Sequence, residues 1–331
     1  MRLAPLAALG LAAALAPAAA RPAAPEEPRL ALPIACEPGK TCFVQNYVDR
    51  DAGPGALDFR CGHRTYDKHD GTDIRILDMA AQRAGVDVLA AAAGRVVAVR
   101  DGVPDISIRA PGAPSVAGHE CGNRVGLALG SGWIIDYCHL AQGSPRVKVG
   151  DMVAVGQPLG RVGLSGQTEF PHLHFSVRHD NAVVDPFSAG PVAPGACPAQ
   201  PTLWTEAAAR ALGYRRGAVL NTGFASGNVT PETIEAHVVQ APAASAALVA
   251  YVRLIGLESA DVVDLKLSGP DGKVLAQGSS PPLDHDKAQW FAQIGRAKPP
   301  AGGWPHGAYV AEAAVRRGGA IALSARWQVA L

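Results

Sequence analysis

The segment Pro171-His172-Leu173-His174-Phe175-Ser176-Val177-Arg178 alternates apolar and polar residues. Successive side chains of a β-strand point to opposite faces, so Leu173, Phe175 and Val177 would face a core. The even-numbered residues from His172 to Arg178 would share the other face, with the two imidazoles ~7 Å apart. Taken alone, this pattern is equally consistent with two surface histidines. We interpret it as a strand whose polar face can serve one site.

A second group, His69-Asp70-Gly71-Thr72-Asp73, lies about one hundred residues earlier. Histidine and aspartate are both zinc ligands. Four residues of straight strand span ~13 Å, which is too far for one metal ion, so a bend is required. Gly71 can supply the bend, and residues 72–77 alternate as a half-buried strand does. The alternative for this group alone is a turn in which Asp73 caps a strand.

A third histidine, His139, ends the strand-like segment 133–140. Alone it would be interpreted as structural. Together, His69, Asp73 and one of His172 or His174 make three protein ligands with one open position, the pattern of a catalytic zinc site. The remaining histidines would transfer protons and stabilise an oxyanion. The spacing does not choose between His172 and His174 as the ligand.

Composition limits the classes of function. The chain has 331 residues, enough for two domains, and 48% of them are hydrophobic. Its 30 basic and 29 acidic residues give a net charge of +1, which argues against nucleic-acid or membrane binding by bulk charge. The 37 glycines and 27 prolines predict many turns and strands and no long helix.

The N-terminus predicts export. Arg2 precedes an apolar stretch over residues 3–15 and small residues at 18–20, the layout of a secretory signal peptide spanning residues 1–20. No later segment is apolar for the ~18 residues that a membrane-spanning helix needs. We therefore expect a periplasmic or secreted protein with no membrane span after signal cleavage.

Export makes disulfides the default state of the cysteines, which are Cys36, Cys42, Cys61, Cys121, Cys138 and Cys197. Six cysteines allow 15 pairings. Cys36 and Cys42 flank a turn, and Cys121 and Cys138 flank a potential hairpin. Cys61 and Cys197 would then remain for one another, although the sequence does not determine the connectivity.

Several ordered blocks resemble the lysostaphin/LytM-type zinc endopeptidases, which cut peptidoglycan cross-links. The blocks run over residues 60–187 and are His69-Asp70-Gly71-Thr72-Asp73, residues 88–96, residues 122–126, Tyr137-Cys138-His139-Leu140, residues 147–163 and residues 171–175. The resemblance implies Zn²⁺ on His69, Asp73 and His174, with His139 and His172 as the catalytic pair. All five positions are filled, unlike in metal-free regulatory members.

The resemblance implies the fold of the first domain, whereas residues 198–331 lie outside it and are predicted as a second domain from their short, regularly spaced strands. We expect an all-β protein in which a compact antiparallel sheet domain of the duplicated-hybrid-motif type precedes a smaller immunoglobulin-like β-sandwich. The expected order is an N-terminal extension at 21–50, the zinc endopeptidase domain at 51–190, a linker at 191–203 and the accessory sandwich at 204–331. Strands are expected at 236–239, 247–255, 264–268, 274–277, 308–315 and 320–329, and a short helix at 206–212.

The expected activity is hydrolysis of peptide cross-links of peptidoglycan by a zinc-activated water. The alternatives are a zinc peptidase acting on protein substrates, or a non-catalytic module that binds cell wall or regulates an amidase. Residues 164–170 depart from the small, Gly-rich approach of the family to Pro171, so Glu169 and Phe170 would reshape the groove. Trp290, Trp304 and Trp327 would pack in a core or form a binding surface, and no protein partner of this domain can be named.

Overall fold

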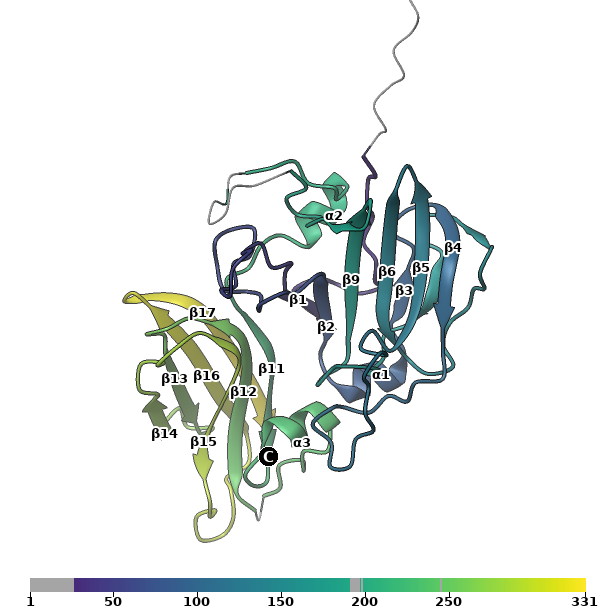
Figure 1. Cartoon of the computed structure of the whole chain (residues 1–331). Coiled ribbons are helices and arrows are strands. Elements are labelled where there is room, and N and C mark those ends of the chain that lie inside the picture. Colours follow the sequence, from purple (N-terminus) through teal and green to yellow (C-terminus); the bar gives the residue numbers. More distant parts are fainter. Residues whose placement is uncertain (1–26, 191–196, 198, 245) are drawn as a thin grey trace, which may run out of the picture.

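The computed structural model describes residues 27–190, 197, 199–244 and 246–331. The predicted signal peptide and most of the predicted linker therefore lie outside the described residues. The described part is nearly all β, as predicted from the composition, with antiparallel sheets in two units (Figure 1). The helices of this part are each six residues long, and none of them is long and apolar enough to cross a membrane.

The first unit is built on one antiparallel sheet in the order β1-β2-β9-β6-β5-β4-β7, with β10 pairing β9. Its strands are β1 (Cys42–Asn46), β2 (Thr72–Ile76), β4 (Gly94–Arg100), β5 (Asn123–Gly130), β6 (Trp133–Leu140), β7 (Met152–Val153), β9 (His172–His179) and β10 (Ala182–Val183). β9 lies between β2 and β6, so the predicted HLH strand is central. Its register opposes His174 to Asp73 and His172 to Arg75.

The main core covers the apolar face of this sheet. Leu173, Phe175 and Val177 are buried in it, which confirms the alternation predicted for β9. A separate ribbon of β3 (Asp87–Leu89) and β8 (Pro158–Arg161) contributes to the same core. So does Trp204, which precedes α2 (Glu206–Ala211) and stacks on Phe175 at 5.4 Å between ring centroids.

The second unit is a sandwich of two antiparallel sheets. One has the order β11-β12-β15 and the other β14-β13-β16-β17. The bounds are β11 (Ala218–Ala225), β12 (Leu248–Leu257), β13 (Val262–Ser268), β14 (Val274–Ser279), β15 (Lys287–Arg296), β16 (Ala308–Arg317) and β17 (Ala320–Ala330). Val252 and Leu254 of one sheet meet Val263 and Leu265 of the other, so the core lies between the sheets.

The strands predicted at 247–255, 264–268, 274–277, 308–315 and 320–329 are confirmed, but that at 236–239 is wrong. There α3 (Pro231–Ala236), which Thr230 and Pro231 start, ends because His237 takes the left-handed conformation at its C-cap, with a φ of 59°. The sequence analysis also missed β11, β15 and α1 (Met79–Ala84), which Asp78 caps. β1 lies within the predicted extension 21–50 yet pairs with β2, so the sheet begins before residue 51.

The tryptophans of the second unit belong to its core. Trp304 is buried, and Trp290 and Trp327 are partly buried against the same interior. This agrees with the core-packing interpretation of the sequence.

All six cysteines are paired, as Cys36–Cys42, Cys61–Cys197 and Cys121–Cys138. These are the pairs suggested by the turn and the hairpin, with the remaining two joined across 136 residues. All of them precede the sandwich, so the second unit has no disulfide and is stabilised by non-covalent contacts.

The two units are docked against each other along β1 and β2. Phe43 and Leu77 of the first unit meet Ala218, Leu220 and Ile255 of the second in an apolar cluster. In Figure 1 the sandwich stands beside β1 and β2, and α3 lies next to α1. The polar face of the first sheet therefore has the second unit as a neighbour.

Candidate metal centre

Three of the predicted ligands meet at one point. Asp73 Oδ1 lies 3.1 Å from His69 Nε2 and 2.9 Å from His174 Nδ1, and those two nitrogens are 3.3 Å apart. Asp73 and His174 are brought together by the β2–β9 register. His69 precedes β2 and reaches the same point because the chain turns at Lys68, whose φ is 64°.

Gly71 has a different role from the one predicted. Its φ is not in the left-handed region, so it does not supply the bend by conformational freedom. Instead, a Cβ at this position would lie 2.5 Å from His174 Nε2 and 3.0 Å from the carbonyl oxygen of Phe175. A glycine is needed here because the His174 ring occupies the space that a side chain would fill.

Hydrogen bonds orient the three ligands. His69 Nδ1 donates to the Tyr47 carbonyl at 2.6 Å, which leaves Nε2 unprotonated and facing the centre. Asn46 Nδ2 donates to Asp73 Oδ2 at 2.9 Å, so Oδ1 remains for the centre. His174 Nε2 lies 3.2 Å from Asp70 Oδ1, and Arg178 holds the other oxygen of Asp70. Partners of this kind fix the ring orientation of metal-binding histidines.

The donor set fits a zinc ion. A tetrahedral ion with Zn–N bonds of about 2.0–2.1 Å separates its ligand atoms by about 3.3 Å, close to the 2.9–3.3 Å found here. The site also favours positive charge. Burial opposes protonation of His174, but the carboxylates of Asp70 and Asp73 outweigh it and raise its pKa to about 9.

The pKa of Asp73 also indicates a site that favours a cation. Its burial opposes ionisation, yet the surrounding imidazoles of His69, His172 and His174 hold the pKa of this carboxyl well below its ordinary value. An ionised carboxylate enclosed by imidazole nitrogens is a donor set that a cation completes.

The two remaining histidines flank this cluster. The rings of His139 and His172 are 4.6 Å apart between centroids, and His172 Nε2 lies 3.4 Å from Asp73 Oδ1. His139 Nδ1 donates to the Ser165 carbonyl at 2.7 Å. His172 Nδ1 donates to the Phe170 carbonyl at 3.0 Å, with Thr168 Oγ1 also at 3.0 Å. Both bonds place the proton on Nδ1, which leaves each Nε2 as a hydrogen-bond acceptor.

The environment keeps His139 neutral. Burial, together with the nearby His172 and His174 rings, lowers its pKa well below the ordinary value. His139 has a φ of 60°, and its backbone N–H donates to the Cys121 carbonyl beside the Cys121–Cys138 disulfide. The disulfide therefore braces the backbone that presents this ring.

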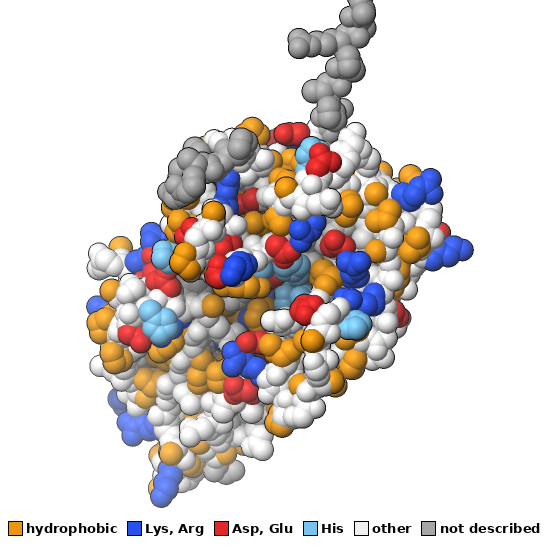
Figure 2. Space-filling model, viewed as in Figure 1, with side chains coloured by type: hydrophobic (Ala, Val, Ile, Leu, Met, Phe, Trp, Pro, Cys, Tyr) orange, Lys and Arg blue, Asp and Glu red, His pale blue; other side chains and the backbone are white. Residues whose placement is uncertain are grey.

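A cavity of about 360 Å³ opens beside the centre. Its walls include His139 and His174 together with Tyr66, Glu120 and Gln167. The Tyr66 ring lies 4.4 Å from the His69 ring and is half exposed. Glu120 belongs to the long loop between β4 and β5, which therefore forms part of this wall. Figure 2 shows a cluster of His side chains in the depression at the centre of this face.

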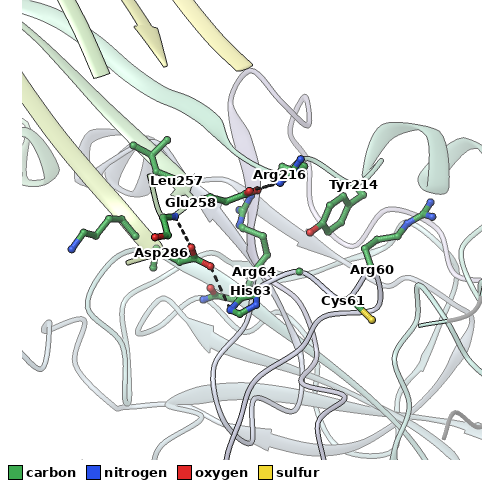
Figure 3. Close-up of a pocket in the computed structure, with 15 residues that line it drawn as sticks. Arg60, Cys61, His63, Arg64, Tyr214, Arg216, Leu257, Glu258 and Asp286 are labelled. Carbon is green, nitrogen blue, oxygen red and sulfur yellow. Dashed lines mark hydrogen bonds and ion pairs between the residues drawn. The ribbon is translucent and has the colours of Figure 1, made fainter. Parts of the chain in front are cut away.

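A second cavity, of about 980 Å³, lies between the two units (Figure 3). Asn46, whose side chain donates to Asp73, also lines this cavity. One residue that supports the metal centre is therefore shared with the cavity wall. Across from Asn46 stand residues of the sandwich, among them Glu258 and Asp286, which pair with Arg216 and with His63. The sequence did not predict this cavity, because its walls come from segments about 200 residues apart.

Three supporting residues of the centre were not predicted from the sequence: Asn46, Tyr47 and Asp70. Asp70 was detectable, because it lies inside the HDGTD motif. Asn46 and Tyr47 carry no local signal, since only the pairing of β1 with β2 brings them to the centre.

Comparisons with known proteins identify the segment that holds the centre. Residues 67–186 match the model of peptidase family M23. The cell division protein DipM of Caulobacter vibrioides is 33% identical over 130 residues, which cover 39% of this chain and 17% of DipM. The match thus spans about a sixth of the length of that relative.

Solved structures are similar over less than half of the chain. A zinc-containing peptidase from Vibrio cholerae has 25% identity and a TM-score of 0.28, with 44% of this chain and 39% of that chain covered. The catalytic domain of the antimicrobial peptidase lysostaphin from Staphylococcus simulans has 24% identity and a TM-score of 0.27, with 43% and 85% covered.

Proposed function

We propose that this chain, whose residues 67–186 form a peptidase family M23 domain, is an exported zinc metalloendopeptidase that hydrolyses peptide cross-links of peptidoglycan. One observation carries the proposal. The donor atoms of His69, Asp73 and His174 lie within 4.8 Å of one another, and His139 and His172 stand beside them with free Nε2 atoms. Three protein ligands with an open position are typical of catalytic zinc sites.

Each residue has a role in this proposal. His69, Asp73 and His174 would hold zinc, which when bound supplies Lewis acidity toward water and toward a scissile carbonyl. His139 Nε2 accepts a proton, because its Nδ1 already donates to Ser165 and the low pKa keeps the ring neutral. His172 Nε2, on the other side of Asp73 Oδ1, carries no proton in this tautomer, so it would accept a hydrogen bond from the attacking water or from the leaving amide.

Two features support export. Disulfides persist in oxidising compartments, and all six cysteines are paired. Residues 1–20 have the layout of a signal peptide. The peptidoglycan substrate lies in the same compartments, so the proposed location and the proposed substrate agree.

The test uses purified sacculi and zinc analysis of the full chain. His69→Ala and His174→Ala should each abolish release of soluble fragments and lower the bound zinc. His179→Ala is the matched control, because this β9 histidine stacks on Trp133 at the far end of the strand. Mass spectrometry of defined cross-linked fragments then identifies the cleaved bond. Full activity of either ligand variant, or cleavage of casein with none of sacculi, would contradict the proposal.

A further inference from the structure

Arg75 is a buried cation close to the proposed catalytic residues. It lies on β2 two residues after Asp73 and opposite His172 in the β2–β9 register. Its side chain is fully buried, and burial lowers its pKa to about 10. A buried guanidinium is costly unless carboxylate or carbonyl groups compensate it.

Two of the four compensating groups come from the first unit, the Gln45 Oε1 atom at 3.2 Å and the Ile76 carbonyl at 3.4 Å, and two come from the second unit. Glu235 of α3 accepts from Arg75 Nη2 at 2.8 Å, and Gln289 Oε1 of β15 accepts from Nη1 at 3.0 Å. Arg253 of β12 donates to the same Glu235 oxygen and also to the Leu77 carbonyl of the first unit at 2.6 Å. Glu235 therefore joins two buried cations, one from each unit.

The free face of Arg75 is covered by Phe170. The Phe170 ring lies over the guanidinium, with the carbon of the guanidinium 4.2 Å from the ring centroid. A cation within about 6 Å of an aromatic face is attracted by it, more strongly where water is excluded. Phe170 is one of the residues in which the approach to Pro171 departs from the family pattern, so this contact gives the departure a role.

Phe170 in turn holds His172. Its carbonyl accepts the proton of His172 Nδ1 at 3.0 Å, and its ring lies 5.0 Å from the imidazole. The bond keeps the proton on Nδ1 and leaves Nε2 facing Asp73. A contiguous series of contacts thus leads from Glu235 of the second unit through Arg75 and Phe170 to His172.

We propose that Glu235, Arg75 and Phe170 are positioning residues, through which the C-terminal sandwich sets the ring orientation and tautomer of His172. The inference rests on the proposed function only where activity is measured, because the orientation and tautomer of His172 can be observed without substrate. It assigns the sandwich a part in the active site, in place of a separate role as a tethered binding module. Groups that orient such residues affect activity about 10- to 100-fold when they are removed.

The first test compares two glutamates of α3 in the zinc-loaded full chain. Glu235→Gln removes the charge shared by the two arginines, and should lower kcat on a defined cross-linked peptide about 10-fold with KM within about 2-fold. Glu232→Gln is the matched control, because Glu232 lies exposed in the first turn of the same helix. Bound zinc should be unchanged in both variants, because neither residue contacts a proposed ligand.

The second test does not depend on the stability of the docked units. Phe170→Leu removes the aromatic face but keeps an apolar side chain, and should lower kcat to a similar extent. Phe170→Tyr keeps the face and should restore kcat to within about 2-fold. Glu206→Gln, at an exposed residue of α2 that pairs with Arg210 on the surface, should have no effect.

Imidazole ¹⁵N–¹H correlation spectra provide a readout without substrate. His172 should be the Nδ1–H tautomer in the wild type and a mixture of tautomers in Glu235→Gln and Phe170→Leu. An unchanged tautomer and unchanged kcat in folded Phe170→Leu would overturn the inference. If the wild type cleaves no sacculi but the two variants still show the tautomer change, the proposed function is refuted and the positioning role of these residues is retained.

Discussion

The two β units bury their polar residues in different ways. All five residues of β2 in the first unit are buried, whereas β13 in the sandwich alternates buried and half-buried residues along its length. Both are antiparallel strands that pair with a neighbour on each side, one of them the edge strand of the sheet. The difference is that β2 has a core on one face and the metal centre with the docked sandwich on the other.

Burying polar groups costs free energy unless hydrogen bonds satisfy them. In the first unit Asp73, Arg75 and His172 each have such partners. In the sandwich the buried charges are Arg253, which faces the first unit, and Asp261, which Arg317 binds. Polar burial is thus concentrated at the site and at the interface, whereas the rest of the sandwich is an ordinary two-sheet core.

The largest expected effect is on activity. His139→Ala should lower kcat about 10²- to 10⁴-fold, the range for a positioned general base, with bound zinc unchanged. His306→Ala, an exposed histidine of the sandwich, should change neither. Steady-state kinetics and metal analysis check this pair. If His139→Ala lost zinc, His139 would be a ligand and the proposed assignment of roles would be wrong.

The second prediction compares the units by their disulfides, all three of which lie before the sandwich. Replacing Cys61 and Cys197 with serine removes a cross-link over 136 residues and should lower the free energy of unfolding by about 5 kcal/mol. The same change at Cys36 and Cys42, six residues apart, should cost about 2 kcal/mol. Urea unfolding checks the order, and a larger loss from the short loop would contradict it.

The sandwich depends on packing. Trp304→Ala should lower the free energy of unfolding by about 3–5 kcal/mol, because the buried indole packs near Tyr309 and donates to the Ala246 carbonyl. Zinc binding should persist at temperatures where the variant is folded. Val274→Ala, at an exposed position of β14, should stay within about 0.5 kcal/mol. Circular dichroism during urea unfolding measures both, and equal losses would contradict the prediction.

The two units should also differ in the sign of a pH dependence, which changes stability gradually over several pH units. Burial raises the pKa of Asp185 in the first unit to about 7. From about pH 4 to 7 the unfolded chain is ionised there while the folded chain holds the proton. Stability therefore falls as pH rises, by at most about 1.4 kcal/mol per pH unit. Asp185→Asn should flatten this slope in urea unfolding at several pH values.

Asp261 of the sandwich should behave oppositely. Burial opposes its ionisation, but hydrogen bonds from Arg317 and from the Glu258 N–H outweigh it and lower its pKa. Its contribution to stability is present above about pH 4 and lost as pH falls through the lowered pKa. Asp261→Asn should therefore cost most at neutral pH. A cost that grew on acidification would contradict the assignment.

Much of the first unit follows from local patterns. The alternation in residues 171–178 is sufficient to place Leu173, Phe175 and Val177 in the core, because the side-chain period of a strand is two. The HDGTD motif and His139 were recognised as one site with β9, and the structure brings all five residues together. Their assignment as ligands and catalytic residues remains a proposal.

Other features have no local signal. The role of Gly71 was mispredicted because it depends on the position of the His174 ring, and that ring comes from another strand. The strand predicted at 236–239 was wrong because an apolar run of that length fits a helix end equally well.

By itself, then, the sequence determined a β-rich chain, the histidines and the aspartate that gather at the candidate metal centre, and two of the cysteine pairs, since each depends on spacing or alternation within short segments. The choice of His174 over His172 as a ligand came from the family resemblance. Only the tertiary structure decided that Asn46 and Tyr47 orient the ligands, that the sandwich docks beside β1 and β2, and that Glu235 reaches Arg75. These contacts join residues far apart in the chain, so they exist only once the sheet register and the docking of the two units are set.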